Sequence, residues 1–418
     1  MRRVVVTGMG VWSCIGQDLQ TVTESLKQGR SGIVFDKTNI SCGLQSGLRG
    51  KVTRPDLKSL LPRKFRVIMS KETEYAYMAS IQAFKQAKIS EEYLKNNEVG
   101  VIFGNDGNME MVDPICEIEK QKSTKNVDVY AWIKTETSNA NICLCNIFGL
   151  RGLSFGVGAA CASGSHAIGL AAIYIRASLQ DMMLVGGAYE LSREGVGAVD
   201  ALEVLSLRNT DPLHASRPFD KDRDGMIPSG GAAALVLEEY EHAVERGATI
   251  LAEVVGYGFS SNGLEDISAP SADGEYIAMK RALDDADLQP SDIDYVNAHA
   301  TSTIAGDIEE AKALTRLFVE ENPMSNVQCP MSNRKPYVSS TKSMTGHENW
   351  MAGASEAVYS ILMMQNNFVA PNINLENVID EAKDLNIVRE TIYAPINIVL
   401  SNSSGMGGTN SALIFKKI

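Results

Sequence analysis

The stretch Gly156-Val-Gly-Ala-Ala-Cys161-Ala-Ser-Gly-Ser-His166-Ala-Ile-Gly-Leu-Ala-Ala172 is the part of the chain on which the fold prediction rests. Thirteen of its 17 residues are Gly, Ala, Ser or Cys, so other elements can pack closely against its backbone. We therefore expect a buried helix that is entered by a tight turn. The thiol of Cys161 would lie at the helix N-terminus, where unpaired N–H groups and the helix dipole favour a thiolate nucleophile. The alternative is a small buried core cysteine.

The composition is that of an ordinary globular protein. Its 418 residues are 44% hydrophobic and 22% charged, enough for two or three domains or one large duplicated unit. The formal net charge of −12 argues against a general nucleic-acid-binding protein, although a local basic patch for an acidic protein partner is compatible with it. The sequence has no run of about 18 apolar residues that would indicate a membrane span. It also lacks the pattern of a signal peptide, so we expect a cytoplasmic protein.

The cysteines predict neither a disulfide framework nor a metal site. Their number is odd and their spacing does not repeat, which indicates a reducing compartment. Cys143 and Cys145 are too close for a usual zinc pair, and no histidine follows at ligand spacing. The seven cysteines are Cys14, Cys42, Cys116, Cys143, Cys145, Cys161 and Cys329.

Strand and helix patterns alternate along the whole chain. Short β-branched runs such as residues 3–7 predict buried strands, and helical patterns of about 10–15 residues lie between them. Such alternation predicts an α/β protein with layered sheets. After a helix at residues 238–247 the same order of patterns repeats, so we expect two halves, residues 1–245 and 246–418.

Two further stretches place histidines just past predicted strands. In Val296-Asn-Ala-His299-Ala-Thr301-Ser-Thr303, His299 lies at the C-terminal end of a strand, where open α/β sheets usually carry ligand chemistry. Thr301 and Thr303 would present two hydroxyls on one side if the strand continues. Val338-Ser-Ser-Thr-Lys342-Ser-Met-Thr-Gly346-His347 ends another strand in the same way. Each histidine alone is more often structural, but the chain has only five of them.

The residues Cys161, His299, Lys342 and His347 together resemble the active site of the β-ketoacyl-acyl-carrier-protein synthases, condensing enzymes of the thiolase superfamily. The resemblance covers essentially the whole chain and is closest to the first of the two elongating types. It implies a duplicated thiolase-like α/β fold of five layers, α-β-α-β-α, and a homodimer with the strand before Cys161 at the interface. The further motifs are Arg3-Val-Val-Val-Thr-Gly-Met-Gly, Arg217-Pro-Phe-Asp-Lys-Asp-Arg-Asp-Gly225, Phe368-Val-Ala-Pro-Asn-Ile-Asn and Asn402-Ser-Ser-Gly-Met-Gly-Gly-Thr-Asn410.

The resemblance also implies a reaction, the decarboxylative Claisen condensation of malonyl carrier protein with a Cys-bound acyl chain in fatty acid synthesis. Cys161 would accept the acyl chain from an acyl carrier protein. His299 and His347 would donate hydrogen bonds to the enolate oxygen as carbon dioxide leaves. The backbone N–H groups of Cys161 and Met406 would hold the second oxyanion.

Supporting roles follow from the same resemblance. Lys342 would pair with Glu310 and balance the charge of the site, and Asp307 would support it. Thr301 and Thr303 would bind the pantetheine arm, although loop hydroxyls often only close turns. No bound cofactor is expected, because the phosphopantetheine arm arrives on the carrier-protein substrate.

The acyl pocket is where the chain departs from its family. Gly107, Met226, Ser404 and Met406 would line it, and the last three replace phenylalanines that the family usually carries. Flexible or small side chains in place of rings would widen the pocket. A specialised ketosynthase of polyene, aryl-polyene or polyketide biosynthesis is therefore the alternative to an enzyme of ordinary fatty acid elongation.

A docking site for the acidic carrier protein is expected at Arg63, Lys64 and Arg66, for which a solvated helix start is the alternative.

Other members of the superfamily fit less well. Degradative thiolases need a second cysteine near the C-terminus, and none follows Cys329. Enzymes with a Cys-His-Asn triad would have Asn where this chain has His347.

Overall fold

The computed structural model describes residues 2–107, 110, 112–321 and 335–418, so Cys329 lies outside the described residues. Its main sheet has 11 described strands in the order β12-β10-β9-β14-β15-β8-β1-β7-β6-β4-β5. These strands are β1 (Val4–Trp12), β4 (Gly100–Gly104), β5 (Ser154–Val157), β6 (Met182–Tyr189), β7 (Gly231–Glu239), β8 (Ala252–Ser261), β9 (Tyr295–Asn297), β10 (Tyr337–Ser339), β12 (Asn386–Ile387), β14 (Ile398–Gly405) and β15 (Thr409–Lys416). Two small described sheets pair β2 (Ile33–Phe35) with β3 (Leu48–Gly50) and β11 (Phe368–Val369) with β13 (Ile392–Tyr393).

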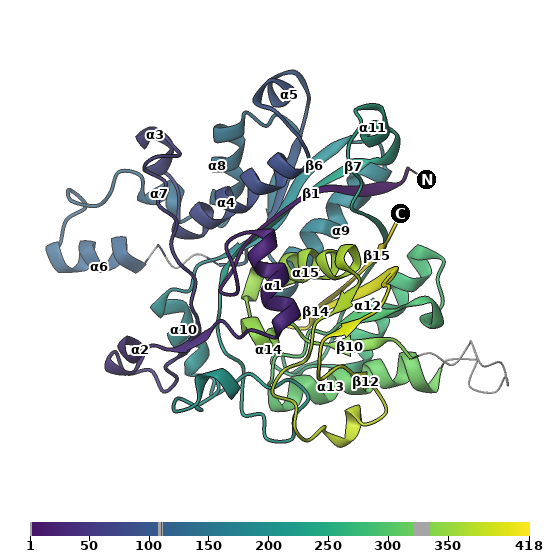
Figure 1. Ribbon diagram of the computed structural model, residues 1–418. Helices are drawn as coiled ribbons and strands as arrows, with labels where there is room; N and C mark the ends of the chain where they lie inside the picture. The colour runs from purple at the N-terminus through teal and green to yellow at the C-terminus, as the bar shows by residue number, and fades with distance from the viewer. Residues whose placement is uncertain (1, 108–109, 111, 322–334) are drawn as a thin grey trace.

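The α-helices flank and separate the strands (Figure 1). They are α1 (Leu19–Gln28), α2 (Lys37–Ser41), α3 (Arg63–Arg66), α4 (Lys71–Gln86), α5 (Glu91–Asn96), α6 (Val112–Gln121), α7 (Ala131–Lys134), α8 (Asn139–Phe148), α9 (Ser163–Arg176), α10 (Arg193–Asp200), α11 (Tyr240–Glu245), α12 (Ala272–Ala286), α13 (Ile304–Thr315), α14 (Lys342–Thr345) and α15 (Ala352–Asn366). None of the described helices is long and apolar enough to cross a membrane.

The two halves of the sheet have the same strand topology. In the first half β1, β7 and β6 pair antiparallel, and β6, β4 and β5 pair parallel. In the second half β8, β15 and β14 pair antiparallel, and β14, β9 and β10 pair parallel. The predicted duplication is therefore confirmed. The halves meet where β1 pairs with β8, and the boundary predicted after residue 245 falls between β7 and β8. How far each half is a separate domain stays a prediction.

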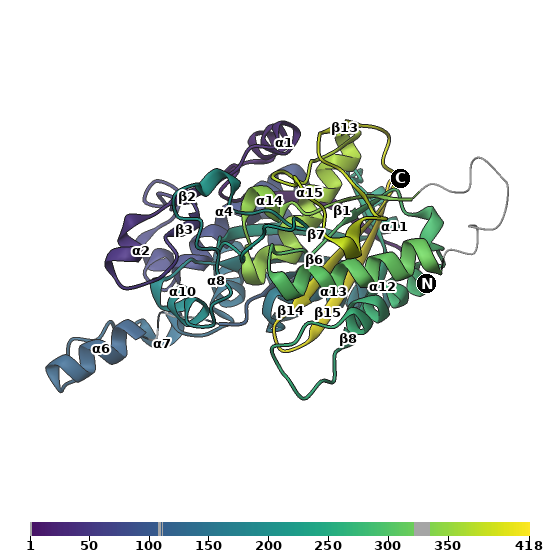
Figure 2. The same cartoon turned by 90° about the horizontal axis from the view of Figure 1, so that it is seen from below.

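Helices and sheet halves form the five expected layers. In Figure 1 they run from α4 and α8 at the upper left, through the first half of the sheet, to α9 and α15 in the centre, and the second half of the sheet and α12 with α13 follow at the lower right. Figure 2 shows the same arrangement from below. Each helical layer has its own apolar core, represented by Phe84 under α4, Ile168 and Val358 between the sheet halves, and Leu283 and Leu314 under α12 and α13.

The small residues of the stretch 156–172 allow the close helix packing that was predicted for them. Helix α9 crosses α15 so closely that a Cβ on Gly164 would lie 2.8 Å from the backbone nitrogen of Ala354. A Cβ on Gly353 of α15 would meet Ser165 of α9 at 2.6 Å. Any larger side chain would force the two central helices apart. The Gly/Ala/Ser run therefore sets the thickness of the middle layer, and with it the distance between the two sheet halves.

Candidate active site

The turn that carries Cys161 lies between β5 and α9. A single 3-10 turn, Ala160–Ala162, precedes the helix, and Ala160 has a φ of 45°. Residues with a Cβ rarely adopt this left-handed conformation. Two hydrogen bonds hold the turn: the Ala160 N–H donates to Asp106 at 2.8 Å, and the Ala159 N–H donates to the Ser163 hydroxyl at 2.8 Å. The predicted tight turn is confirmed.

The ionisation of Cys161 differs from the sequence-based expectation. Burial raises the pKa of the Cys161 thiol to about 11, while backbone N–H groups of Met406 and Cys161 and the charge of Lys342 lower it. Desolvation of the thiolate therefore outweighs these favourable contacts. The helix itself begins at Ser163, two residues after the sulfur-bearing residue. The backbone N–H groups favour the thiolate as expected, but burial outweighs them and leaves the pKa of the thiol above its ordinary value.

The hairpin between β14 and β15 lies directly over this turn. A Cβ on Gly405 would come within 2.7 Å of the Ala159 carbonyl oxygen, so only glycine lets the two backbones approach this closely. As a result the backbone N–H groups of Met406 and of Cys161 itself lie near the Cys161 sulfur, where they lower the pKa of its thiol. The two backbone donors predicted to hold an oxyanion thus meet at the reactive atom.

The two histidines of the predicted site lie side by side. Their ring centroids are 5.3 Å apart and the rings are perpendicular. His299 follows the end of β9 by two residues, and the N–H of His347 donates to the Ile227 carbonyl at 2.7 Å. Burial, and then the nearby charge of Lys342, hold the pKa of each imidazole well below its ordinary value. Both rings are therefore neutral at physiological pH.

Neutral imidazoles with free nitrogens suit hydrogen-bond donation. Nδ1 of His299 and both ring nitrogens of His347 are buried and have no hydrogen-bond partner among the described residues. Buried polar atoms normally find partners in a folded protein, so exceptions point to a ligand or to a catalytic role. These nitrogens can form hydrogen bonds with an oxygen atom of a bound substrate.

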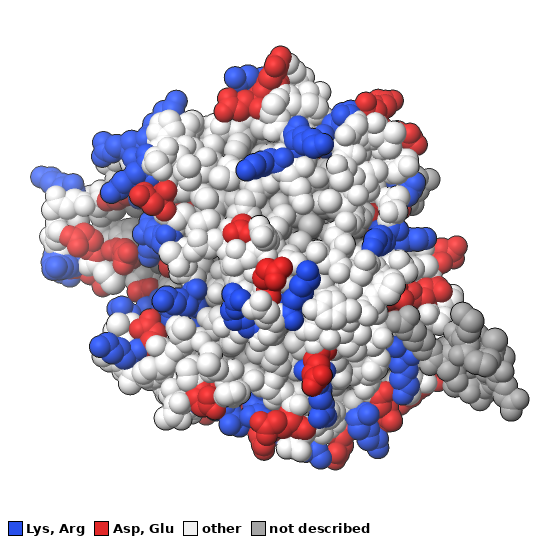
Figure 3. Space-filling model, in the orientation of Figure 1, with Lys and Arg blue, Asp and Glu red and all other residues white. Residues whose placement is uncertain are grey.

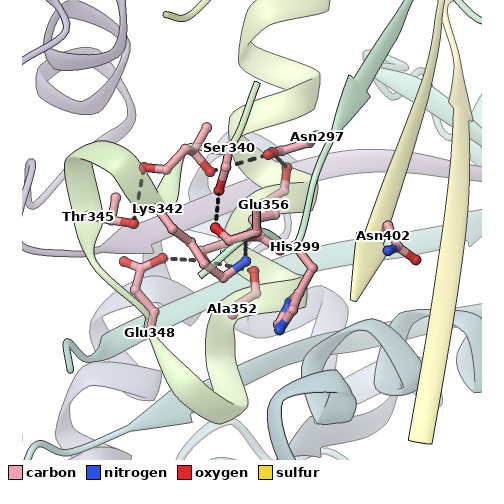
Figure 4. A network of polar contacts seen from close by, with 12 residues as sticks. Asn297, His299, Ser340, Lys342, Thr345, Glu348, Ala352, Glu356 and Asn402 are labelled. Atoms are coloured by element: carbon pink, nitrogen blue, oxygen red, sulfur yellow. Dashed lines mark hydrogen bonds and ion pairs between the residues drawn. The ribbon is translucent and has the colours of Figure 1, made fainter. Parts of the chain in front are cut away.

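Lys342 has a different partner from the one predicted. Its ammonium pairs with Glu356 of α15, and both side chains are at most 2% exposed. The predicted pair with Glu310 is wrong, because Glu310 accepts the backbone N–H groups of His299 at 2.7 Å and Ala300 at 2.6 Å. Figure 4 shows Lys342 beside Glu356, with His299 next to the pair. Glu310 therefore orients the loop that carries His299. Lys342 influences Glu310 only through its charge, which lowers the pKa of Glu310.

Glu356 was missed from the sequence although a signal for it exists. It is the only charged residue in α15, a helix of small and apolar side chains that is buried for most of its length. A lone acid in such a helix needs a buried partner. Burial raises the pKa of Glu356 to about 7, while Lys342 lowers it.

Asp307 and the two threonines shape the loop after His299. The Asp307 carboxylate accepts the N–H groups of Phe219 at 2.8 Å and of Ser302 at 3.0 Å. It therefore fixes the backbone between Thr301 and Thr303, whose hydroxyls are 3.0 Å apart. The threonines face the same way, as predicted, although β9 ends before them.

One cavity of about 330 Å³ collects these groups. Cys161, His299 and His347 line it. Also in its wall are six other residues predicted for the site, Met226, Thr301, Thr303, Glu310, Ser404 and Met406. Lys342 is buried behind the cavity. Nucleophile, oxyanion donors and neutral imidazoles thus face one space, which is the arrangement required for acyl transfer coupled to enolate formation.

Comparison with known proteins supports the same conclusion. A family model described as the β-ketoacyl synthase N-terminal domain matches residues 1–243, and the model of the C-terminal domain matches residues 251–376. The chain belongs to the β-ketoacyl synthase family. It is therefore an acyltransferase of the condensing type.

Individual relatives of this β-ketoacyl synthase are similar over their full length. The chain is 39% identical to 3-oxoacyl-[acyl-carrier-protein] synthase 1 of Escherichia coli K12, with all of both chains covered. A β-ketoacyl synthase structure from Burkholderia phymatum matches with a TM-score of 0.92, 35% identity and full coverage of both chains. A type II polyketide ketosynthase in complex with its acyl-carrier protein matches with a TM-score of 0.87 and 27% identity, covering 100% of this chain and 99% of that one.

Gly107, the remaining acyl-pocket residue, is not in the wall of the Cys161 cavity of this synthase. It lines a neighbouring cavity of about 90 Å³ together with Tyr189 and Trp350. A Cβ on Gly107 would lie 3.1 Å from the Trp350 indole, which stacks on Tyr189 at a centroid distance of 4.6 Å. An acyl-binding role for Gly107 stays a prediction.

The predicted docking residues form the short helix α3. Arg63 and Lys64 are exposed and Arg66 is half-buried. None of the three forms an ion pair with a described residue. Basic side chains gather over the α3 region at the upper left of Figure 3. The synthase thus carries a basic surface there despite its net negative charge.

Proposed function

We propose that the protein is a 3-oxoacyl-[acyl-carrier-protein] synthase that elongates acyl chains in fatty acid synthesis. The observation that carries the proposal is the single cavity in which Cys161, its two oxyanion donors and two neutral histidines meet. The similarity to synthases of both elongating types supports it, at 39% identity for a type 1 and 37% for a type 2 enzyme. An ishigamide ketosynthase and a type II polyketide ketosynthase also match, but at the lower identities of 28% and 27%, so the specialised alternative is not better supported.

The first half of the reaction transfers an acyl chain to the enzyme. The Cys161 sulfur attacks the carbonyl carbon of an acyl thioester, and its proton passes to the departing pantetheine sulfur. Because the pKa of the thiol is about 11, the proton has to leave as the new bond forms. The N–H groups of Cys161 and Met406 stabilise the tetrahedral oxyanion before the carbon–sulfur bond to the carrier breaks.

The second half uses the histidines. A malonyl thioester loses carbon dioxide, and the electron pair of the broken carbon–carbon bond passes into an enolate. His299 and His347 donate hydrogen bonds to the enolate oxygen, which they can do because they are neutral and have free nitrogens. The α-carbon then attacks the acyl-Cys161 carbonyl, the carbon–sulfur bond breaks, and a 3-oxoacyl thioester leaves on its carrier.

The partners belong to the same proposal. The carrier protein would dock at Arg63, Lys64 and Arg66, and its pantetheine arm would lie along Thr301 and Thr303; no other cofactor is required. The protein would be a homodimer. In support, β5 is an edge strand with alternating exposed residues, and such edges usually pair or are covered. The six described cysteines are all free, which fits the reducing cytoplasm.

Mass spectrometry of the acyl-enzyme tests the proposed function. Incubation with a saturated acyl-carrier-protein thioester should add one acyl mass to the peptide that contains Cys161. Cys161→Ser keeps the size of the side chain but should hold far less acyl group, since a hydroxyl is a weaker nucleophile. Acylation of another residue, or none in the wild type, would reject the proposal.

A further inference from the structure

A tryptophan lies close to the turn with the nucleophile, and no step of the reaction above uses it. Trp350 is in the 3-10 turn Asn349–Met351, which packs against the 3-10 turn of Cys161 and against β6. Glycines allow this packing, since a Cβ on Gly164 or on Gly187 would lie 3.0 Å from the Trp350 carbonyl oxygen. The backbone of Trp350 is therefore fixed between the start of α9 and strand β6.

Two neighbours set the position of the indole ring. The ring stacks on Tyr189, with a centroid distance of 4.6 Å and an angle of 19° between the planes. Gly107 also lies against it, because a Cβ on Gly107 would come 3.1 Å from Cζ2 of the indole. Gly107 follows Asp106, whose carboxylate accepts the N–H of Ala160 in the Cys161 turn. The indole thus fills the space beside the segment that holds the turn with the nucleophile.

Hydrogen bonding does not account for an indole at this position. Its Nε1 is buried and has no hydrogen-bond partner among the residues that the structure describes. A buried N–H without a partner lowers the free energy of unfolding, and such groups are rare in folded proteins. A phenylalanine could stack on Tyr189 without this cost. Stability therefore does not explain the tryptophan, and its bulk points to a function.

The walls of the Cys161 cavity indicate the direction of the acyl chain. An acyl thioester has a polar pantetheine arm on one side of its carbonyl group and an apolar chain on the other. The cavity wall contains the hydroxyls of Thr301 and Thr303, which would take the arm, and it contains apolar side chains as well. Of these, Met226 and Val204 belong to an apolar cluster that reaches α10, so the chain should run along this cluster. The cluster consists of Leu44, Leu191, Val196, Val199, Val204, Leu205 and Met226.

The next space along this direction does not suit an alkyl chain. Glu194 and Gly195, which precede Val196 of the cluster on α10, line the cavity of about 90 Å³ together with Tyr189 and Trp350. This volume is far below the roughly 300 Å³ at which ligand pockets begin. An alkyl chain there would also separate acidic side chains from water, which is unfavourable. The acids in the wall are Glu72, Glu110, Asp113, Glu190 and Glu194.

We propose that the stacked Trp350–Tyr189 pair closes the acyl end of the active site, so that the synthase condenses short acyl chains and rejects long ones. A chain on Cys161 runs past Met226 and stops at the two rings. Side chains near the thioester then set how wide a chain can be, whereas Trp350 sets how long it can be. The inference rests on the proposed function, because it names the class of acyl chain that the same site accepts.

The test measures acylation of Cys161 by butyryl, octanoyl and palmitoyl thioesters of carrier protein, followed by mass spectrometry. The wild type should react at least about tenfold faster with butyryl than with palmitoyl thioester, since chain atoms that meet a wall cost at least that much. Trp350→Ala removes the wall and should raise the ratio of palmitoyl to butyryl rates at least about tenfold. Trp350→Leu leaves a smaller void than alanine and should raise the ratio too, so it provides the test if the alanine variant does not fold.

Tyr393→Ala is the control for loss of an aromatic ring. Its side chain is 72% exposed on β13 and lines neither cavity, so the ratio should equal that of the wild type. Equal butyryl and palmitoyl rates in the wild type, or a wild-type ratio in the folded Trp350 variants, would overturn the closing role and leave the proposed function standing. Failure of every thioester to acylate Cys161 would instead reject the proposed function, and the inference with it.

Discussion

At the scale of single residues, burial controls the chemistry of the site. Desolvation raises the pKa of the Cys161 thiol to about 11 and depresses the pKa values of His299 and His347. The same cavity therefore keeps its nucleophile protonated and its imidazoles neutral. Because their pKa values are depressed, the neutral imidazoles donate hydrogen bonds but accept protons poorly. This fits enolate stabilisation better than general base catalysis.

The raised thiol pKa predicts how Cys161 reacts with an alkylating reagent. Its rate with iodoacetamide should increase about tenfold per pH unit up to roughly pH 10, because only the thiolate reacts and its fraction grows at that rate below the pKa. Peptide mass spectrometry can follow Cys161 separately from the exposed Cys42 and Cys116, which report on the reagent at each pH. A plateau below about pH 8 would mean that the helix and backbone donors outweigh burial after all.

Sequence patterns identified the reactive residues better than their partners. Cys161, His299 and His347 stand in distinctive Gly/Ala/Ser/Thr-rich stretches just past strands, and the structure brings them to one cavity. The partner of Lys342 was predicted wrongly, because sequence spacing does not tell which of several buried acids an ammonium reaches. The correct partner, Glu356, comes from the facing helix and depends on how α14 and α15 pack.

At the scale of elements, the β14–β15 hairpin depends on its contact with the Cys161 turn. Gly405 touches the Ala159 carbonyl, and this contact places the Met406 N–H at the sulfur. The side chain of Met406 is 50% exposed and does not hold the hairpin in place. Backbone contact, rather than the side chain, therefore sets the oxyanion geometry.

Gly405→Ala should impair turnover without unfolding the protein. Its Cβ would lie 2.7 Å from a backbone oxygen, so the hairpin has to move away from the sulfur. A displacement of about 1 Å at a reacting centre costs roughly 100-fold in rate, and we expect kcat to fall by about that factor. A Cβ on Gly197 of α10 would meet no atom within 4 Å, so Gly197→Ala is the control and should keep full activity. Steady-state kinetics together with circular dichroism would separate a loss of turnover from unfolding. A wild-type kcat in Gly405→Ala would contradict the role of the contact.

Elements with strong local signals were predicted closely. The sequence predicts a helix at residues 70–88 with Ser70 as its cap, and the Ser70 hydroxyl accepts the Thr73 N–H at the start of α4, which spans Lys71–Gln86. Shorter strands were less well defined. The sequence predicts a strand at residues 295–298, but β9 ends at Asn297, because strand ends depend on the neighbouring strands with which they pair.

At the scale of the whole molecule, the duplication explains why distant residues share one site. The turn with Cys161 follows β5, and Lys342 follows β10, the strand in the equivalent position of the second half. The loops after these equivalent strands contribute to the same site, since the charge of Lys342 lowers the pKa of the Cys161 thiol. The sequence indicated the repeat of strand and helix patterns, but the matching strand order emerges only from the pairing of the folded sheet.

The basic surface over α3 predicts how the carrier protein is recognised. Reversing Arg63 and Lys64 to Glu should raise the apparent KM for acyl carrier protein about tenfold at low salt and leave the turnover of small thioesters unchanged. Reversing Lys280 and Lys312 to Glu, on α12 and α13 away from α3, makes the same change in net charge and is the control. An unchanged KM for carrier protein would show that the patch is only a solvated helix.

Decarboxylation of malonyl carrier protein by two variants is the most direct test of the central claim, that sulfur holds the acyl chain while the imidazoles stabilise the enolate. The account predicts that Cys161→Ala no longer elongates chains but still releases carbon dioxide from malonyl carrier protein. His299→Ala should lose both activities, with decarboxylation falling at least about 100-fold. Elongation by Cys161→Ala, or decarboxylation by His299→Ala at the wild-type rate, would contradict this division of labour.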